Sequence, residues 1–157
     1  MRGVRHIPCL FALVLAAALG GCAGSDTGKG FATSVDKART AKALSSLQTG
    51  LVTIGLLQVD SGGAAVQNVA TALQAKDPTN RYTTAAPTET GVVQVLGGGG
   101  GPVLLVALSD TASEDRPATY VAAWQGAGTT MYYTGTAVPV YTTQPPAGPG
   151  WGSTPPH

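Results

Sequence analysis

Histidine, cysteine and aromatic residues are scarce in this sequence. Its 157 residues include two histidines and two cysteines, and aromatic residues make up 6%. Beyond the N-terminal stretch, the only histidine is His157 and the only cysteine is Cys22. A Ser-His-Asp or Cys-His catalytic arrangement needs an internal histidine, and a zinc-type site needs several histidines or thiolates. The sequence therefore favours a non-enzymatic protein without a cofactor or a metal.

The chain also has no large excess of positive or negative charge. Nine basic and eight acidic residues give a net charge of +1, and they are scattered along the chain. Nucleic-acid binding needs a basic patch, and attraction to anionic lipid needs a polybasic segment. The sequence therefore predicts no nucleic-acid partner.

The longest apolar run near the N-terminus is short. Residues 9–19 form an apolar stretch of about eleven residues behind Arg2 and Arg5, whereas a membrane-spanning helix needs about twenty. A positive start followed by such a stretch is typical of a secretory signal peptide. Small residues and then Cys22 follow it.

The stretch Leu19-Gly20-Gly21-Cys22 resembles the lipobox of bacterial lipoproteins. The resemblance implies that residues 1–21 are removed and that Cys22 receives a diacylglyceryl group, with further acylation of its new N-terminus. Two or more acyl chains give stable anchoring. The expected location is the extracytoplasmic side of a bacterial membrane, inner or outer. An ordinary cleaved signal with an incidental Cys22 is the alternative.

Processing would change the chain that folds. The mature chain would lose Cys9 and so have no intramolecular disulfide, and its net charge would become −1. Residues 22–32 are predicted to be the lipidated cysteine and a flexible tether. Residues 33–143 can form one domain with a single core, and residues 144–157, rich in proline and glycine, are predicted to be a disordered tail.

Two helices are predicted in the first half of the domain. Ser34 is a candidate N-cap, and leucines and Ile54 at a three-four spacing define one apolar stripe over residues 44–54. Residues 51–59 could instead form a buried strand, although one long helix is preferred. A second, short helix is indicated by Val66, Val69 and Leu73. Residues 81–90 are predicted to form a polar loop.

Four strands are predicted in the second half, over residues 92–96, 102–109, 119–125 and 129–135. Their short connections favour an antiparallel meander, and the long helix is the available cover for one face. The glycine run 97–101 is interpreted as a hairpin, because no Lys-Ser or Lys-Thr follows it as in a phosphate loop. The predicted fold class is α+β, with a long N-terminal helix and a second short helix packed on a four-stranded antiparallel β-meander.

That order of segments, ending in Gly-Thr-Thr-Met-Tyr-Tyr, resembles the soluble part of type IV pilin-like proteins over residues 34–135. The resemblance lies in the layout. The chain departs from pilins because it has no segment like Phe-Thr-Leu-Ile-Glu after a short leader, and a lipobox stands in that place.

Aromatic residues offer one candidate binding face. Tyr120 and Trp124 share one face of their predicted strand, and Tyr132 and Tyr133 lie across the hairpin. If that face is open, it suits sugar rings or the apolar patch of an envelope protein. If it packs on the helix it is core, which is the preferred interpretation.

Acidic residues offer two weaker candidates. Asp110, Glu114 and Asp115 lie in one oxygen-rich loop that could accept calcium, but the loop lacks EF-hand alternation and reads better as a solvated turn. Three other carboxylates could pair as acid and base in a hydrolase, although each stands beside a turn signal. These are Asp60, Asp77 and Glu89.

Three classes of function remain open to the sequence. The preferred one is a membrane-anchored, non-enzymatic binding or scaffolding module of the cell envelope, with an envelope protein or glycan as partner. The second is a pilin-like accessory component of a secretion or surface-fibre system. The third is a carboxylate-dependent envelope hydrolase.

Overall fold

The computed structural model describes residues 27–156, with side chains from Ser34 onward. It shows an α+β fold of two helices and one six-stranded sheet. The helices are α1 (Thr27–Asp60) and α2 (Val69–Lys76), and the strands are β1 (Arg81–Thr83), β2 (Val92–Gly97), β3 (Val103–Asp110), β4 (Thr119–Gly126), β5 (Thr129–Gly135) and β6 (Trp151–Gly152). Cys22 and the signal segment lie outside the described residues.

Helix α1 is a single rod of 34 residues. Residues 51–59 are helical, as preferred from the sequence. The helix begins at Thr27, so Ser34 is not its N-cap and the second half of the predicted tether is helical. Once a helix has nucleated, each added residue gains a hydrogen bond, and this offsets the low helix propensity of Gly28 and Gly30.

The sheet runs in the order β1-β2-β3-β4-β5-β6. Strands β2 to β5 form the predicted antiparallel meander, and β6 pairs antiparallel with β5. Strand β1 pairs parallel with β2, so the sheet is mixed and not four-stranded. The sequence predicted a loop over residues 81–90, and this was wrong for residues 81–83, which form β1. A three-residue strand is too short to show an alternating pattern.

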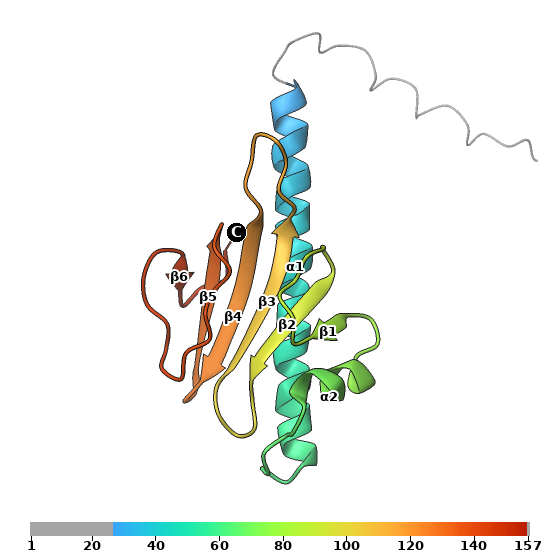
Figure 1. Ribbon diagram of the computed structural model, residues 1–157, viewed down its shortest axis with the longest axis vertical. Helices are drawn as coiled ribbons and strands as arrows, with labels where there is room; N and C mark the ends of the chain where they lie inside the picture. The colour runs from blue at the N-terminus through green and yellow to red at the C-terminus, as the bar shows by residue number, and fades with distance from the viewer. Residues whose placement is uncertain (1–26, 157) are drawn as a thin grey trace, which may run out of the picture.

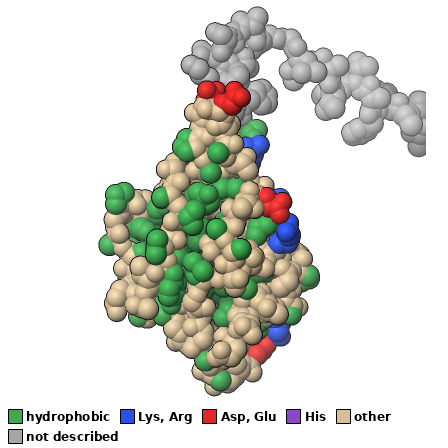
Figure 2. All heavy atoms as spheres, in the orientation of Figure 1, with side chains coloured by type: hydrophobic (Ala, Val, Ile, Leu, Met, Phe, Trp, Pro, Cys, Tyr) green, Lys and Arg blue, Asp and Glu red, His purple; other side chains and the backbone are tan. Residues whose placement is uncertain are grey.

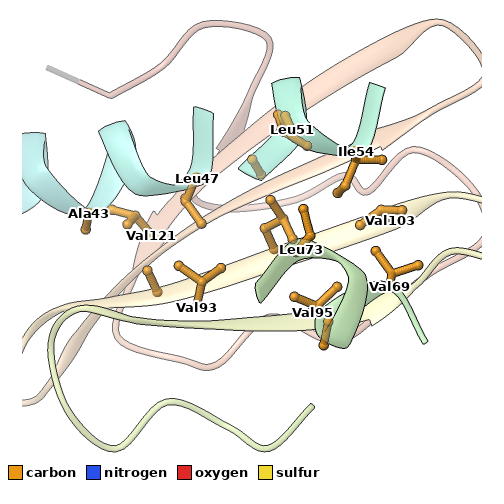
Figure 3. Packing of buried hydrophobic residues seen from close by; sticks show 14 of the residues in the cluster. Ala43, Leu47, Leu51, Ile54, Val69, Leu73, Val93, Val95, Val103 and Val121 are labelled. Atoms are coloured by element: carbon orange, nitrogen blue, oxygen red, sulfur yellow. The ribbon is translucent and has the colours of Figure 1, made fainter. Parts of the chain in front are cut away.

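One face of the sheet packs on α1 and α2 (Figure 1). The apolar stripe of α1 meets every second residue of β2, β3 and β4, and Leu73 of α2 closes the side of the same cluster (Figure 3). Gly50 lets the helix lie close to β3, since a Cβ there would stand 2.8 Å from Leu105 Cδ1. The main core therefore lies between α1 and the sheet, as the stripe predicted.

The opposite face of the sheet carries a second core. Leu104, Val106, Ala122 and Trp124 are buried there together with Tyr133. Residues 136–156, here called the C-terminal segment, lie over this face: the Trp124 indole N–H donates to the Thr142 carbonyl oxygen at 2.8 Å, and β6 pairs with β5.

The C-terminal segment differs from the disordered tail expected for residues 144–157. Trp151 stacks at a tilt against Tyr133, with ring centroids 5.3 Å apart, and the Tyr141 hydroxyl donates to the Pro102 carbonyl oxygen at 3.1 Å. A few aromatic anchors therefore hold a segment whose proline and glycine content rules out a long regular element. Within residues 27–156, neither helix is long and apolar enough to span a membrane.

Replacing Leu47 by alanine should destabilise the fold by about 2–5 kcal/mol, because Leu47 is fully buried between α1 and the sheet. Denaturant unfolding measures the change. Gln48→Ala, at the next and exposed position, is the matched control and should stay within about 0.5 kcal/mol of the parent. Equal effects at both positions would contradict the placement of the core.

Chymotrypsin should cut slowly after Tyr141 in the parent protein, because that ring packs against the second core. Trp151→Ala should expose the site, since it removes the stacking on Tyr133. Mass spectrometry of timed digests gives the two rates. Rapid cutting at Tyr141 in the parent would contradict the packing of the C-terminal segment on the second core.

Candidate functional site

The four candidate aromatic residues do not form one face. Tyr120, Trp124 and Tyr133 belong to the second core, whereas Tyr132 packs on the side of α1. Trp124 is 1% exposed. The shared face of Tyr120 and Trp124 was predicted correctly, but it is neither open nor packed on the helix. The C-terminal segment covers it, and this was not expected.

Charged side chains stay at the margins of that covered face. In Figure 2, hydrophobic and uncharged atoms occupy its centre, and the basic and acidic side chains lie along one edge and at the two ends. Below the surface, Gln94 of β2 donates to the Thr84 carbonyl oxygen, and its Oε1 is a buried atom without a partner. The described residues give this face no cluster of ionisable groups.

The acidic loop after β3 joins the sheet to α1. Asp110 accepts from Arg39 at 2.7 Å and lies 3.4 Å from Arg116, which in turn donates to Asp36 at 2.6 Å. Glu114 and Asp115 are exposed on the loop. Two guanidinium groups already neutralise Asp110, and the described residues contain no group of three or more acidic, histidine or cysteine side chains suited to a metal.

The three candidate hydrolase carboxylates have separate partners. Asp60 pairs with Lys76 at 2.9 Å, and Glu89 pairs with Arg81 at 2.5 Å. Asp77 accepts hydrogen bonds from its own turn. None of these contacts joins two of the three carboxylates, so the geometry gives no acid and base pair among them.

Asp77 organises the turn that follows α2. Its carboxylate accepts from the Thr79 backbone N–H at 3.0 Å and from the Thr79 hydroxyl, and also from Asn80 Nδ2 and the Tyr82 hydroxyl, both at 2.7 Å. Hydrogen bonds from Asn80, then Thr79 and Tyr82, outweigh burial and hold the pKa of Asp77 well below its usual range. Burial, followed by the contact with Asp77, raises the pKa of Tyr82. The cluster fixes the path from α2 into β1.

Three adjoining hollows surround the β2–β3 hairpin at the C-terminal end of α1. Their volumes are about 250, 450 and 380 Å³. Glycines of the hairpin line each of them: Gly98 and Gly99 border the first two, and Gly100 borders the first and the third. The walls come from the end of α1, the connection to α2 and the β4–β5 turn. This region, residues 97–101 with the hollows beside them, is called the glycine-hairpin site below.

The backbone of the hairpin requires glycine. Gly97, Gly98, Gly99 and Gly100 all have positive φ, and a Cβ on Gly97 would collide with the Pro102 carbonyl oxygen and the Tyr141 ring. The hairpin interpretation of this run is therefore confirmed. Gly99, where a Cβ would meet nothing within 4 Å, leaves the main chain open to a bound group.

Among the residues that the structure describes, no charged side chain lines the three hollows. Their polar lining consists of amides and hydroxyls, and the rest is aliphatic or glycine. Such a surface favours an uncharged ligand, which it can meet with amide hydrogen bonds and aliphatic contacts. The sequence did not indicate this site, because its polar residues are Gln58, Gln67, Asn68, Thr71, Thr84, Gln125 and Thr130, which are far apart along the chain.

Comparison of the chain with family models, with curated proteins and with solved structures found no match. The glycine-hairpin site is thus a candidate on its shape and lining chemistry alone.

Asp77→Asn should destabilise the fold by about 1–3 kcal/mol at pH 7, because hydrogen bonds to a charged carboxylate are lost. The lowered pKa means that the carboxylate stabilises the fold above its unfolded pKa, about 3.9, and that this contribution fades as the pH falls below it. The difference between parent and variant should therefore shrink from pH 7 to pH 3 in denaturant unfolding.

Asp115→Asn is the matched control for this prediction, since Asp115 is exposed in the β3–β4 loop. It should leave stability nearly unchanged at both pH values. A difference for Asp77→Asn that is the same at pH 7 and pH 3 would show that the charge of Asp77 contributes nothing.

Proposed function

We propose that the chain is a lipid-anchored lipoprotein of the bacterial cell envelope, and that it works as a non-enzymatic binding or scaffolding module. The lipobox-like stretch ending at Cys22 supports the anchor. The glycine-hairpin site is the binding surface of this proposal, because it combines the hollows with an uncharged, amide-rich lining.

The observation that carries the proposal is the position of the two ends of α1. The helix begins at Thr27, so a lipidated Cys22 would lie at most about 18 Å from it. The hollows reach Ile54, roughly 40 Å further along the helix axis. Figure 1 shows the start of α1 projecting past the sheet, at the end opposite the β2–β3 hairpin. A chain anchored at Cys22 would hold the site away from the membrane.

The lining favours neutral partners. Within the described part of the chain, a carboxylate- or phosphate-rich ligand would find no cation in the hollows, and a basic ligand would find no carboxylate. An uncharged peptide segment or a neutral glycan of the envelope fits this chemistry.

A pilin-like accessory role is the second candidate. It is supported by the projecting N-terminal part of α1 and the antiparallel meander of β2 to β5, which keep the layout of the pilin-like resemblance. Co-purification with a secretion or fibre complex is the expected result of that role, and recovery of the chain without such a complex would count against it.

Cys22→Ala should move the chain from the membrane fraction to the soluble fraction, because the thioether anchor needs the cysteine sulfur. Fractionation of cells with and without detergent measures the change. Cys9→Ala is the matched control and should leave the chain in the membrane. Membrane retention of the Cys22→Ala chain would refute the anchor.

A photo-crosslinking residue at Gln67, beside the hollows, should capture an envelope partner in cells. The same residue at Glu114, in the exposed loop at the other end of the sheet, is the control and should capture little. Equal capture at both positions, or none at Gln67, would argue against the glycine-hairpin site as the binding surface.

A further inference from the structure

On the side away from β3, the last part of β2 has no strand beside it among the described residues. Strand β1 pairs with Val92 to Gln94 and stops there, although β2 continues to Gly97. The chain leaves the sheet at Thr84, whose carbonyl oxygen accepts from Gln94 Nε2 at 3.1 Å. Figure 1 shows the β2–β3 hairpin extending past the end of β1. Residues 95–97 of β2, beyond this point, are called the open edge.

The backbone of the open edge points away from β3. The Gly98 N–H donates to the Pro102 carbonyl oxygen at 3.0 Å, on the β3 side. A trans peptide sets the Gly97 C=O opposite to that N–H, so this carbonyl points outward. Backbone groups alternate in direction along an antiparallel strand, and those of Val95 therefore share the outward direction of Gly97. The open edge presents main-chain groups in the geometry that a neighbouring strand uses.

A hollow of about 450 Å³ runs along the open edge. All three residues of the edge line it, and successive residues of a strand point to opposite faces of the sheet, so the hollow follows the edge and not one face. Exposure rises in the same direction, from buried Val95 to half-buried Leu96 and exposed Gly97. The opposite wall of the hollow is uncharged and includes Gln67 and Thr71.

The open edge lacks the usual protection against pairing. Exposed strand edges are commonly protected by charged side chains or proline. The outer strand β1 follows this rule, since Arg81 stands at its start and pairs with Glu89. The open edge reads Val-Leu-Gly and has neither a charge nor a proline. It can therefore accept a further strand.

We propose that an uncharged, extended segment of another polypeptide binds in this hollow by adding a strand to the open edge. A strand carries N–H and C=O groups along both of its edges, so one edge pairs with β2 and the other meets the amides and hydroxyls of the opposite wall. A neutral glycan does not repeat such groups at the spacing of a strand. The inference rests on the proposed function for the choice of site, and it narrows the partner of the glycine-hairpin site to a peptide.

The size and lining of the hollow define the peptide further. Three residues of open edge span about 10 Å, so the contact involves few hydrogen bonds and is weak and reversible. Side chains of the added strand on the α1 face would meet Val66 and Val69, which belong to the rim of the main core. The segment should therefore carry small aliphatic side chains at every second position.

Selection of peptides tests the class of partner. The probe is a phage-displayed library of random peptides of about nine residues, long enough to cover the open edge in several registers. The target is the full-length, lipidated chain in detergent micelles. Selected peptides should be uncharged, with small aliphatic residues at alternate positions, and fluorescence anisotropy of the synthetic peptides should give dissociation constants in the micromolar range.

N-methylation of a selected peptide, one residue at a time, separates strand pairing from binding by side chains alone. A methyl group removes the N–H donor and keeps the two backbones apart. Methylation of residues that face β2 should weaken binding at least about tenfold, and methylation of the residues between them less than about threefold. The expected signature is a loss that alternates along the peptide.

A bulky side chain in the hollow provides the variant of the protein. Thr71→Trp should fill the space beside the open edge and weaken peptide binding at least about tenfold. Ala75→Trp, one turn further along α2 and also exposed, is the matched control and should stay within about twofold of the parent. Both variants should keep the melting temperature of the parent, because neither position is buried.

The outcomes separate strand addition from the proposed function. Strand addition is overturned if no selected peptide loses affinity with Thr71→Trp, or if N-methylation acts without alternation. Capture of a partner at Gln67 in cells would then leave the proposed function standing, with a partner other than an extended peptide. An alternating loss on N-methylation, without capture at Gln67 in cells, would support strand addition and count against the role of the site in the envelope.

Discussion

Burial of β3 on both of its faces is the constraint on which the other elements depend. Val103, Leu105 and Ala107 pack in the main core toward α1, and Leu104 and Val106 belong to the second core, so the strand is apolar and buried from Val103 to Leu108. Such a strand is stable only when both faces of its sheet are covered. Helix α1 supplies one cover. The C-terminal segment supplies the other through a small number of aromatic anchors, and the result is three layers built from one chain without a disulfide among the described residues.

The two covers leave different parts of the molecule available for function. The C-terminal segment occupies the aromatic face and thereby removes the surface that looked most suitable for sugar or protein binding. The hollows form instead at the end of α1, where the hairpin glycines add no side chains of their own beside the helix. On the far side of α1, Val52, Leu56 and Val59 stay exposed because the sheet covers only one side of a long helix. A membrane anchor at the start of α1 would fix the orientation of both surfaces relative to the membrane.

Local patterns predicted most of the elements. The three-four spacing of Leu44 to Ile54 predicted the inward face of α1, and short β-rich segments between turn signals placed β2 to β5 within a residue at each end. Strands β1 and β6 were missed because they are short and depend on pairing with residues far along the chain. Gly50 has a low intrinsic helix propensity, yet it allows α1 to approach Leu105 closely. The residues of the glycine-hairpin site were missed because scattered amides show no pattern until the chain folds.

The sequence by itself determined the scarcity of histidine and cysteine, the balance of charge, the lipobox-like stretch at Cys22 and the order of helix and strands, since these depend on composition and near neighbours. Only the tertiary structure decided which residues pack on each face of the sheet and which side chains contact one another. It buried Trp124 under the C-terminal segment, divided Tyr132 from Tyr133, bound Asp110 to two arginines and gathered uncharged residues around the hairpin. Those outcomes depend on contacts between residues distant in sequence, and such contacts form only when the layers pack together.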